Sequence, residues 1–372
     1  MTSIIYVGMD VHTTNYTLCC YSMEDDRFFA EVQVEPDAKN ILKYLARIEK
    51  QQSRDCRIVC GYEAGCLGYS LYHQLHAHGI DCVILAPTTM MTKPGKRIKT
   101  DRRDARLISK CLAFHTYSPV YIPTEMDDAV KEYIRMRDDA NSALARVKQQ
   151  IIAFCIRHGK IHDGKSYWTN KHLEWLSSLD LGNKILSEVL QEYLIRYYQL
   201  REQVDMYDMR INELAQAEPY RQKVEKLGCF RGIAAHTALS FCVEVGDFRR
   251  FATAQEFGSY LGLVPGECSS GDKQQYTGIT KAGNSHLRKL LVETAQVFGR
   301  SATKSGKSVA LKERQAKCDS LTVAYADKAN ARLKKKYFKI AMRSKANIAK
   351  TAVAREMACF IWGMMTDNIS CA

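Results

Sequence analysis

The order of predicted strands and helices in the first third of the chain restricts its fold more than any other feature. Apolar runs rich in β-branched and aromatic residues alternate there with segments whose apolar residues recur at helical spacing. In chain order the sequence predicts strands at residues 4–10, 16–22 and 28–34, a helix at 37–50, a strand at 57–62, a helix at 67–78, a strand at 81–86 and a helix at 100–114. This part of the chain is therefore of the α/β class.

Acidic residues follow two of these strands and begin the last helix. The predicted order is that of an RNase H-like domain, in which the first strand and the strand after the first helix are neighbours. Asp10 ends the first strand and Glu63 follows the fourth, so both would leave the sheet side by side. Asp101 and Asp104 would lie on one face of the last helix. Because four carboxylates at one point repel one another, we predict two Mg²⁺ ions between them, or Mn²⁺.

Basic residues surround this aspartate pair in the sequence. They are Lys93, Lys96, Arg97, Lys99, Arg102, Arg103 and Arg106. Such a frame suits a metal site that also receives a polyanion, because the basic side chains bind phosphates while the aspartates bind the ion. Residues 99–106 alone leave an alternative open, a solvated helix in which Arg102 and Arg103 pair with the aspartates.

Composition excludes several other classes of protein. The chain of 372 residues carries a formal net charge of +13, which points to an anionic partner such as nucleic acid. No apolar run approaches the ~18 residues that would cross a bilayer, and the first residues do not have the pattern of a signal peptide. The 14 cysteines include no Cys-x-x-Cys pair, so zinc modules are not expected and the thiols are reduced. We therefore predict a cytoplasmic protein without membrane contact.

The middle of the chain predicts a long helical hairpin. No proline occurs between Pro123 and Pro219, and two apolar seams alternate steps of three and four residues, as in coiled coils. The seam residues are Val130, Tyr133, Ala140, Leu144, Val147, Ile151 and Phe154, then Leu190, Tyr193, Tyr197, Leu200, Val204, Tyr207, Ile211 and Leu214. Arg137 interrupts the first seam. The hairpin either coils with a second subunit or packs only on its own chain.

The last third predicts a mainly helical domain with nucleic-acid-binding features. Residues 228–239 resemble a turn between two helices that offers backbone N–H groups to a DNA phosphate, although alanine stands at the usual second glycine position. Basic residues outnumber acids from 300 to 355, with Lys334, Lys335 and Lys336 as the densest run. Before this basic segment in the sequence, four polar residues either contact DNA or cap and line a helix. These are Lys281, Asn284, His286 and Arg288.

These motifs together resemble one known family, the DEDD transposases of insertion sequences (the IS-one-ten family). The motifs are Tyr6-Val7-Gly8-Met9-Asp10, Tyr62-Glu63-Ala64-Gly65, residues 99–106, Gly262-Leu263-Val264-Pro265 with Ser269-Ser270-Gly271, and residues 279–288. The resemblance implies a RuvC-like domain at 1–122, a coiled-coil region at 123–225 and a C-terminal transposase domain at 226–372.

The resemblance also implies roles for particular residues. Asp10, Glu63, Asp101 and Asp104 match the metal-binding acids, and Ser270 matches the catalytic serine, with Ser269 as the one-residue alternative. From local charge, and not from the resemblance, we predict these nucleic-acid-binding residues: Lys96, Arg97, Lys99, Arg102, Arg103, Lys281, Arg288, Lys334, Lys335 and Lys336. The implied partners are donor and target double-stranded DNA and a structured guide RNA. Members act in the bacterial nucleoid as dimers that form synaptic tetramers, with acids and serine from different subunits.

The chemistry of a serine nucleophile favours recombination over hydrolysis. A covalent phosphoserine conserves the energy of the broken phosphodiester, so strands can be exchanged and rejoined without ATP. Three other functions compete with this one. They are a metal-dependent nuclease or Holliday-junction resolvase that uses the acids alone, an actin-like ATPase suggested by residues 8–15, and a non-catalytic RNA-binding protein. His12, two residues after Asp10, is interpreted as structural.

Overall fold

A computed structural model describes residues 3–51, 56–65, 67–90, 100–267, 275–300 and 306–369. The chain divides into two compact units, Met1–Ile122 and Pro123–Ala372, and each is described by itself. In the described part of the chain, no helix combines the length and the apolar character that crossing a membrane would require.

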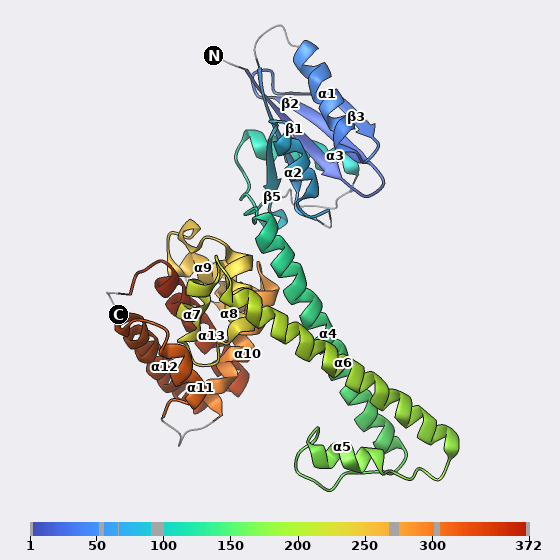
Figure 1. The fold of residues 1–372 in the computed structure, drawn as a ribbon. Helices are drawn as coiled ribbons and strands as arrows, with labels where there is room; N and C mark the ends of the chain where they lie inside the picture. Colours follow the sequence, from blue (N-terminus) through green and yellow to red (C-terminus); the bar gives the residue numbers. More distant parts are fainter. Residues whose placement is uncertain are drawn as a thin grey trace. The chain divides into compact units, whose positions relative to one another are not determined.

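The first unit is built on a five-stranded mixed sheet (Figure 1). Its elements are β1 (Ser3–Val11), β2 (Tyr16–Ser22), β3 (Arg27–Val34), α1 (Ala38–Gln51), β4 (Cys56–Glu63), α2 (Ser70–Ala77), β5 (Asp81–Leu85), a 3₁₀ turn η1 (Pro87–Thr89) and α3 (Asp101–Ala113). The strand order is β3-β2-β1-β4-β5, with β1 antiparallel to β2 and parallel to β4. The predicted order of strands and helices is confirmed, and it is compatible with an RNase H-like domain.

Helices cover both faces of this sheet. Successive side chains of a strand point to opposite faces, and on β1 the side chains of Ile5, Val7 and Met9 pack in one core with α1 and α2. Tyr6 packs in a second core with the apolar side of α3. The central strand is therefore buried on both sides, as expected when helices cover parallel strands.

The packing of α3 on β1 depends on Gly8. A Cβ atom at this position would lie 2.0 Å from the backbone oxygen of Ala105 and 2.4 Å from the backbone nitrogen of Ser109. Any side chain would therefore push the backbone of α3 away from the sheet. This close approach sets how near the first turn of α3 lies to the end of β1.

The second unit begins with the predicted helical hairpin. It consists of α4 (Glu125–Arg157) and α6 (Lys184–Gln216), which pack side by side, with the short α5 (Asn170–Ser177) in the connection between them (Figure 1). Seam residues such as Leu144, Ile151 and Tyr197 are buried between the helices. Arg137, which interrupts the first seam, forms a bidentate ion pair with Asp208 of α6, with N–O distances of 2.7 and 2.9 Å.

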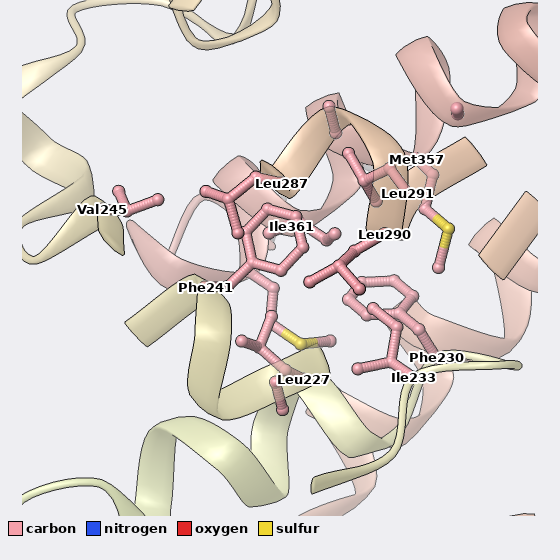
Figure 2. Close-up of a cluster of buried hydrophobic side chains, with 14 of the residues drawn as sticks. Leu227, Phe230, Ile233, Phe241, Val245, Leu287, Leu290, Leu291, Met357 and Ile361 are labelled. Carbon is pink, nitrogen blue, oxygen red and sulfur yellow. The ribbon is translucent and has the colours of Figure 1, made fainter. Parts of the chain in front are cut away.

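A helical domain follows the hairpin. Its elements are α7 (Arg221–Gly228), α8 (Ala235–Val245), η2 (Phe248–Arg250), α9 (Ala254–Tyr260), β6 (Pro265–Glu267), β7 (Tyr276–Ile279), α10 (Ser285–Ala295), η3 (Gln296–Gly299), α11 (Val309–Gln315), α12 (Ser320–Ala341) and α13 (Ala346–Met365). Figure 2 shows side chains from α7, α8, α10 and α13 meeting in its core, among them Phe241, Leu290 and Ile361. Val130 of α4 and Ile211 of α6 belong to the same core. The hairpin and the domain are thus joined by shared packing, and the domain boundary at residue 225 stays a prediction.

The Gly8 contact yields a testable prediction. We expect Gly8→Ala to lower the free energy of unfolding by about 1–3 kcal/mol, because the added methyl group meets backbone atoms that move only with the whole helix. The matched control is Gly65→Ala, where the nearest atom to a new Cβ is 3.9 Å away. Urea unfolding followed by circular dichroism measures both. Equal stability of the two variants would contradict the account of α3 packing.

Candidate active site

Two acidic side chains stand at one edge of the sheet because β1 and β4 are parallel neighbours. The parallel register continues to the pair Met9 and Tyr62, and the next residues along the two strands are Asp10 and Glu63. The side chain of Asp10 is 14% exposed, whereas Glu63 is exposed. The sequence-based expectation that these two acids leave the sheet side by side agrees with this register.

The first turn of α3 supplies the other two acids. The side chain of Thr100 caps the helix by accepting a hydrogen bond from the backbone N–H of Arg103, and Asp101 and Asp104 follow in the first turn. Burial raises the pKa of Asp10, the nearby charges of Asp101 and Asp104 raise it further, and His12 opposes the shift. The acids of α3 are therefore close enough to Asp10 to disfavour its charged form.

Asp10, His12 and Asp101 form a group that could hold a metal ion. Each offers one ligand atom, and these atoms lie within 4.8 Å of one another. The Nε2 atom of His12 lies 3.2 Å from Oδ2 of Asp10. Carboxylate oxygens are the ligands that Mg²⁺ and Mn²⁺ prefer, and an imidazole suits Mn²⁺ better than Mg²⁺. Glu63 and Asp104 are outside this group of three. Of the four predicted acids, only Asp10 and Asp101 therefore belong to it.

His12 is the member of this group that we did not predict as a ligand. We interpreted it as structural because it lies two residues beyond Asp10. The strand extends to Val11 and places His12 directly after it, where the ring turns back to Asp10. The available signal was the spacing Asp-x-His at a strand end, which alone does not distinguish a ligand from a neighbour.

Two arginines of α3 pair with a carboxylate of β3. Arg102 Nε lies 3.3 Å from one carboxylate oxygen of Glu31, and Arg106 Nη2 lies 2.6 Å from the other. The alternative in which Arg102 pairs with Asp101 or Asp104 is therefore wrong in this structure. Lys93, Lys96, Arg97 and Lys99 lie outside the described residues. Nucleic-acid binding by this frame stays a prediction.

The serine motif is carried by a small antiparallel hairpin. β6 pairs with β7, and the residues that connect them, 268–274, include Ser269 and Ser270 and lie outside the described residues. Just before β6, Gly262 has a φ of +64°, and a Cβ there would lie 2.0 Å from the backbone oxygen of Ala282. The backbone N–H of Lys281 donates to the oxygen of Gly262 at 3.1 Å. The two motifs that flank the serine are thus joined at the base of the hairpin.

A buried charge network anchors this base. His286 of α10 lies between two carboxylates, with Nδ1 2.6 Å from Glu244 of α8 and Nε2 2.7 Å from Asp138 of α4. Burial alone would lower the pKa of His286, but its hydrogen bonds to Asp138 and Glu244 raise it to about 9. Asn284 caps α10 through the N–H of Leu287 and donates to Glu244.

The sequence left open whether four polar residues between 281 and 288 contact DNA or cap and line a helix, and the structure answers this for two of them. Asn284 and His286 cap and anchor α10 inside the domain. Arg288 donates from Nη1 to the backbone oxygen of Leu261 at 2.9 Å, and Lys281 is exposed. DNA contacts by Lys281 and Arg288 stay predictions. In the basic run, Lys336 pairs with Glu356 at 2.5 Å and Lys335 is exposed.

The predicted turn between two helices is present in the same domain. α7 ends at Gly228 and α8 begins at Ala235, without a side chain that caps α8. Between the two helices Gly232 has a φ of +87°, a conformation that favours glycine. A DNA-phosphate contact at this turn stays a prediction.

Acids at the strand ends of an RNase H-like sheet, in a strongly basic chain, are typical of enzymes that cut and join nucleic-acid strands. Comparison with known proteins narrows this class. A family model for IS110-type DEDD proteins, described as "Transposase", matches residues 7–156, and the model described as "Transposase IS116/IS110/IS902 family" matches residues 225–314.

Curated relatives agree with both models. The putative transposase y4qE of Sinorhizobium fredii is 35% identical, with 82% of this chain and 75% of that protein covered. The transposase for insertion sequence element IS1533 of Leptospira borgpetersenii is 32% identical, with 90% of this chain and 95% of that protein covered. The chain belongs to the IS110-type DEDD family of insertion-sequence transposases. It is a DNA transposase, and DNA is its partner.

The network around His286 predicts a pH dependence of stability. The pKa of His286 is about 9 in the folded protein and 6.5 in an unfolded chain, so its stabilising contribution is complete below pH 6.5 and is lost as the pH rises to 9. We expect unfolding free energy to fall by about 2 kcal/mol between pH 6.5 and 9, and His286→Gln to remove most of this slope.

Urea unfolding at several pH values measures the effect. His158→Gln is the matched control, because His158 is exposed in the same unit. The same slope in His286→Gln and in the unchanged protein would show that the network does not carry the effect.

Proposed function

We propose that this transposase cuts and rejoins DNA strands through a covalent phosphoserine, with divalent metal held by Asp10, Glu63, Asp101 and Asp104. The observation that carries the metal part is the group of three ligand atoms from Asp10, His12 and Asp101 within 4.8 Å. The resemblance of the Ser269-Ser270-Gly271 motif to the serine motif of the family supports the phosphoserine intermediate.

The residues of the acidic site fit a hard divalent cation. Burial raises the pKa of Asp10, and the charges of Asp101 and Asp104 raise it further; a bound cation would favour the charged form of Asp10. Bound Mg²⁺ or Mn²⁺ would supply Lewis-acid stabilisation of charge at the scissile phosphate. Asp10 and Asp101 would bind the ion, and His12 would orient the carboxylate of Asp10 through its Nε2 contact or join as a ligand.

Ser270 would act as the nucleophile. Its Oγ atom loses a proton and forms a bond to phosphorus, while the bond from phosphorus to the 3′ oxygen breaks and that oxygen takes up a proton. Attack of another 3′ hydroxyl on the phosphoserine reverses these steps and joins a new pair of strands. Ser269 is the alternative nucleophile, because only the spacing from Pro265 and the adjacency to Gly271 distinguish the two.

A guide RNA and a homo-oligomer belong to the same proposal. The structured RNA rests on the resemblance alone. The oligomer has support from α6, where Ile195, Tyr198, Met206 and Met209 are all exposed and lie on one face of the helix at steps of three, eight and three residues. Solvent-exposed apolar side chains in a row are typical of a surface that packs against another helix. We infer that the hairpin coils with a second copy in the dimer and in the synaptic tetramer.

A nuclease or Holliday-junction resolvase is the second candidate, because the acidic site alone could hydrolyse DNA. Two substitutions separate it from the recombinase. We expect Asp101→Asn to lower strand cleavage about 100-fold or more, since metal stabilisation of the transition state is worth several kcal/mol. We expect Ser270→Ala to abolish the covalent protein–DNA adduct. Incubation with DNA carrying the element ends and with RNA from its non-coding flank, followed by denaturing gels, measures both.

Ser269→Ala is the matched control, and it should keep the adduct. Both catalytic variants should still bind DNA with an affinity close to that of the unchanged protein. Continued cleavage by Ser270→Ala without an adduct would favour the resolvase and contradict the phosphoserine route. A fully active Asp101→Asn variant would contradict the metal site.

A further inference from the structure

A groove of about 1310 Å³ opens in the helical domain of the second unit. Its walls come from α9, from β6 and β7, and from α12 and α13. Pro265 and Thr277, which line it, belong to the two strands that the serine-containing segment connects. The groove therefore adjoins the base of the serine hairpin, and nothing in the acidic site of the first unit accounts for it.

The charged residues that line the groove, which we call its rim, are mostly basic. Among the lining residues the charged ones are Lys281, Arg332, Lys336, Arg355 and Glu356. Glu356, whose side chain is 11% exposed, pairs with both Arg332 and Lys336. Four cations against one carboxylate leave an excess of three positive charges, and an anionic ligand would be attracted to this rim.

Apolar side chains also line the groove, and we call them its floor. Ile348 of α13 is 55% exposed there, and Phe360 and Trp362 also line the groove. Ile348 lies near the start of α13, and the two aromatic residues lie near its end. Apolar side chains at both ends of this helix offer contact area to an extended apolar ligand. Positive charge at the rim together with apolar surface inside is the combination used by proteins that hold single-stranded nucleic acid, whose phosphates and base faces are both accessible.

We propose that this groove binds a single-stranded stretch of DNA, with phosphates on the cations of the rim and bases on the apolar floor. A duplex stacks its bases inside and offers mainly phosphates and groove edges, so it would leave Ile348 and Phe360 without a partner. An apolar peptide would leave the cations unpaired. DNA is favoured over RNA because β6 and β7 flank, in sequence, the segment with the serine that attacks DNA in the proposed function, on which this choice of strand rests.

Fluorescence anisotropy with a labelled 12-nucleotide oligo-dT tests the rim, using the full-length protein without divalent metal at several salt concentrations. Arg355→Gln should weaken binding about 5-fold or more and reduce the slope of log affinity against log salt by about 0.7, the value for one phosphate contact of a single strand. The matched control is Lys339→Gln, which removes an exposed cation of α12 outside the groove. It should change affinity less than 2-fold.

A second pair of variants tests the floor without changing charge. Ile348→Ser removes an apolar side chain that lines the groove, and Leu321→Ser removes one of α12 that is equally exposed, at 55%, outside it. We expect Ile348→Ser to weaken oligo-dT binding about 3-fold or more and to leave binding of a 12-base-pair duplex unchanged. Leu321→Ser should leave both unchanged.

Equal effects of Arg355→Gln and Lys339→Gln, or equal losses of duplex and single-strand binding in Ile348→Ser, would overturn the proposal. Tighter binding of oligo-rU, with the same sensitivity to Arg355→Gln, would overturn the choice of DNA. Ser270→Ala and Asp101→Asn should bind oligo-dT like the unchanged protein. Their cleavage tests therefore decide the proposed function separately from the groove.

Discussion

The close packing of α3 on Gly8 is the constraint on which the acidic site depends. It brings a helix terminus that carries two aspartates against the end of the central strand, although the carboxylates there repel one another. Folding thus holds Asp10 and Asp101 together at an electrostatic cost, and the close approach of α3 to Gly8 helps to keep them there. Carboxylates that are held close together in this way are suited to bind a divalent cation, because the cation relieves their repulsion. Arg102 and Arg106 of α3 pair with Glu31 on β3.

The serine hairpin is supported in a different way. Its base is fixed by backbone hydrogen bonds between two sequence motifs and by the buried His286, which links α10 to α8 and α4 through two carboxylates. The hairpin strands also line a basic groove. In the proposed function, the first unit would supply the acids that hold the metal, and the second unit would supply the serine.

Much of the first unit could be predicted because its signals are local. Alternating apolar runs gave the strands, and parallel pairing of the first strand with the fourth follows from their order, so Asp10 and Glu63 were expected at one edge. His12 was missed because a residue just past a strand end has no periodic pattern that fixes its direction. The pairing of Arg102 with Glu31 was missed because it joins β3 to α3 across 71 residues of sequence. The network of Asp138, Glu244 and His286 and the groove depend on tertiary packing, and neither has a signature in any one segment.

Anomalous diffraction from crystals of the protein grown with Mn²⁺ tests the central claim most directly. The account predicts an anomalous peak within bonding distance of the carboxylates of Asp10 and Asp101, and the loss of that peak in the Asp10→Asn variant. Well-ordered Asp10 and Asp101 side chains with no peak between them at saturating Mn²⁺ would contradict it.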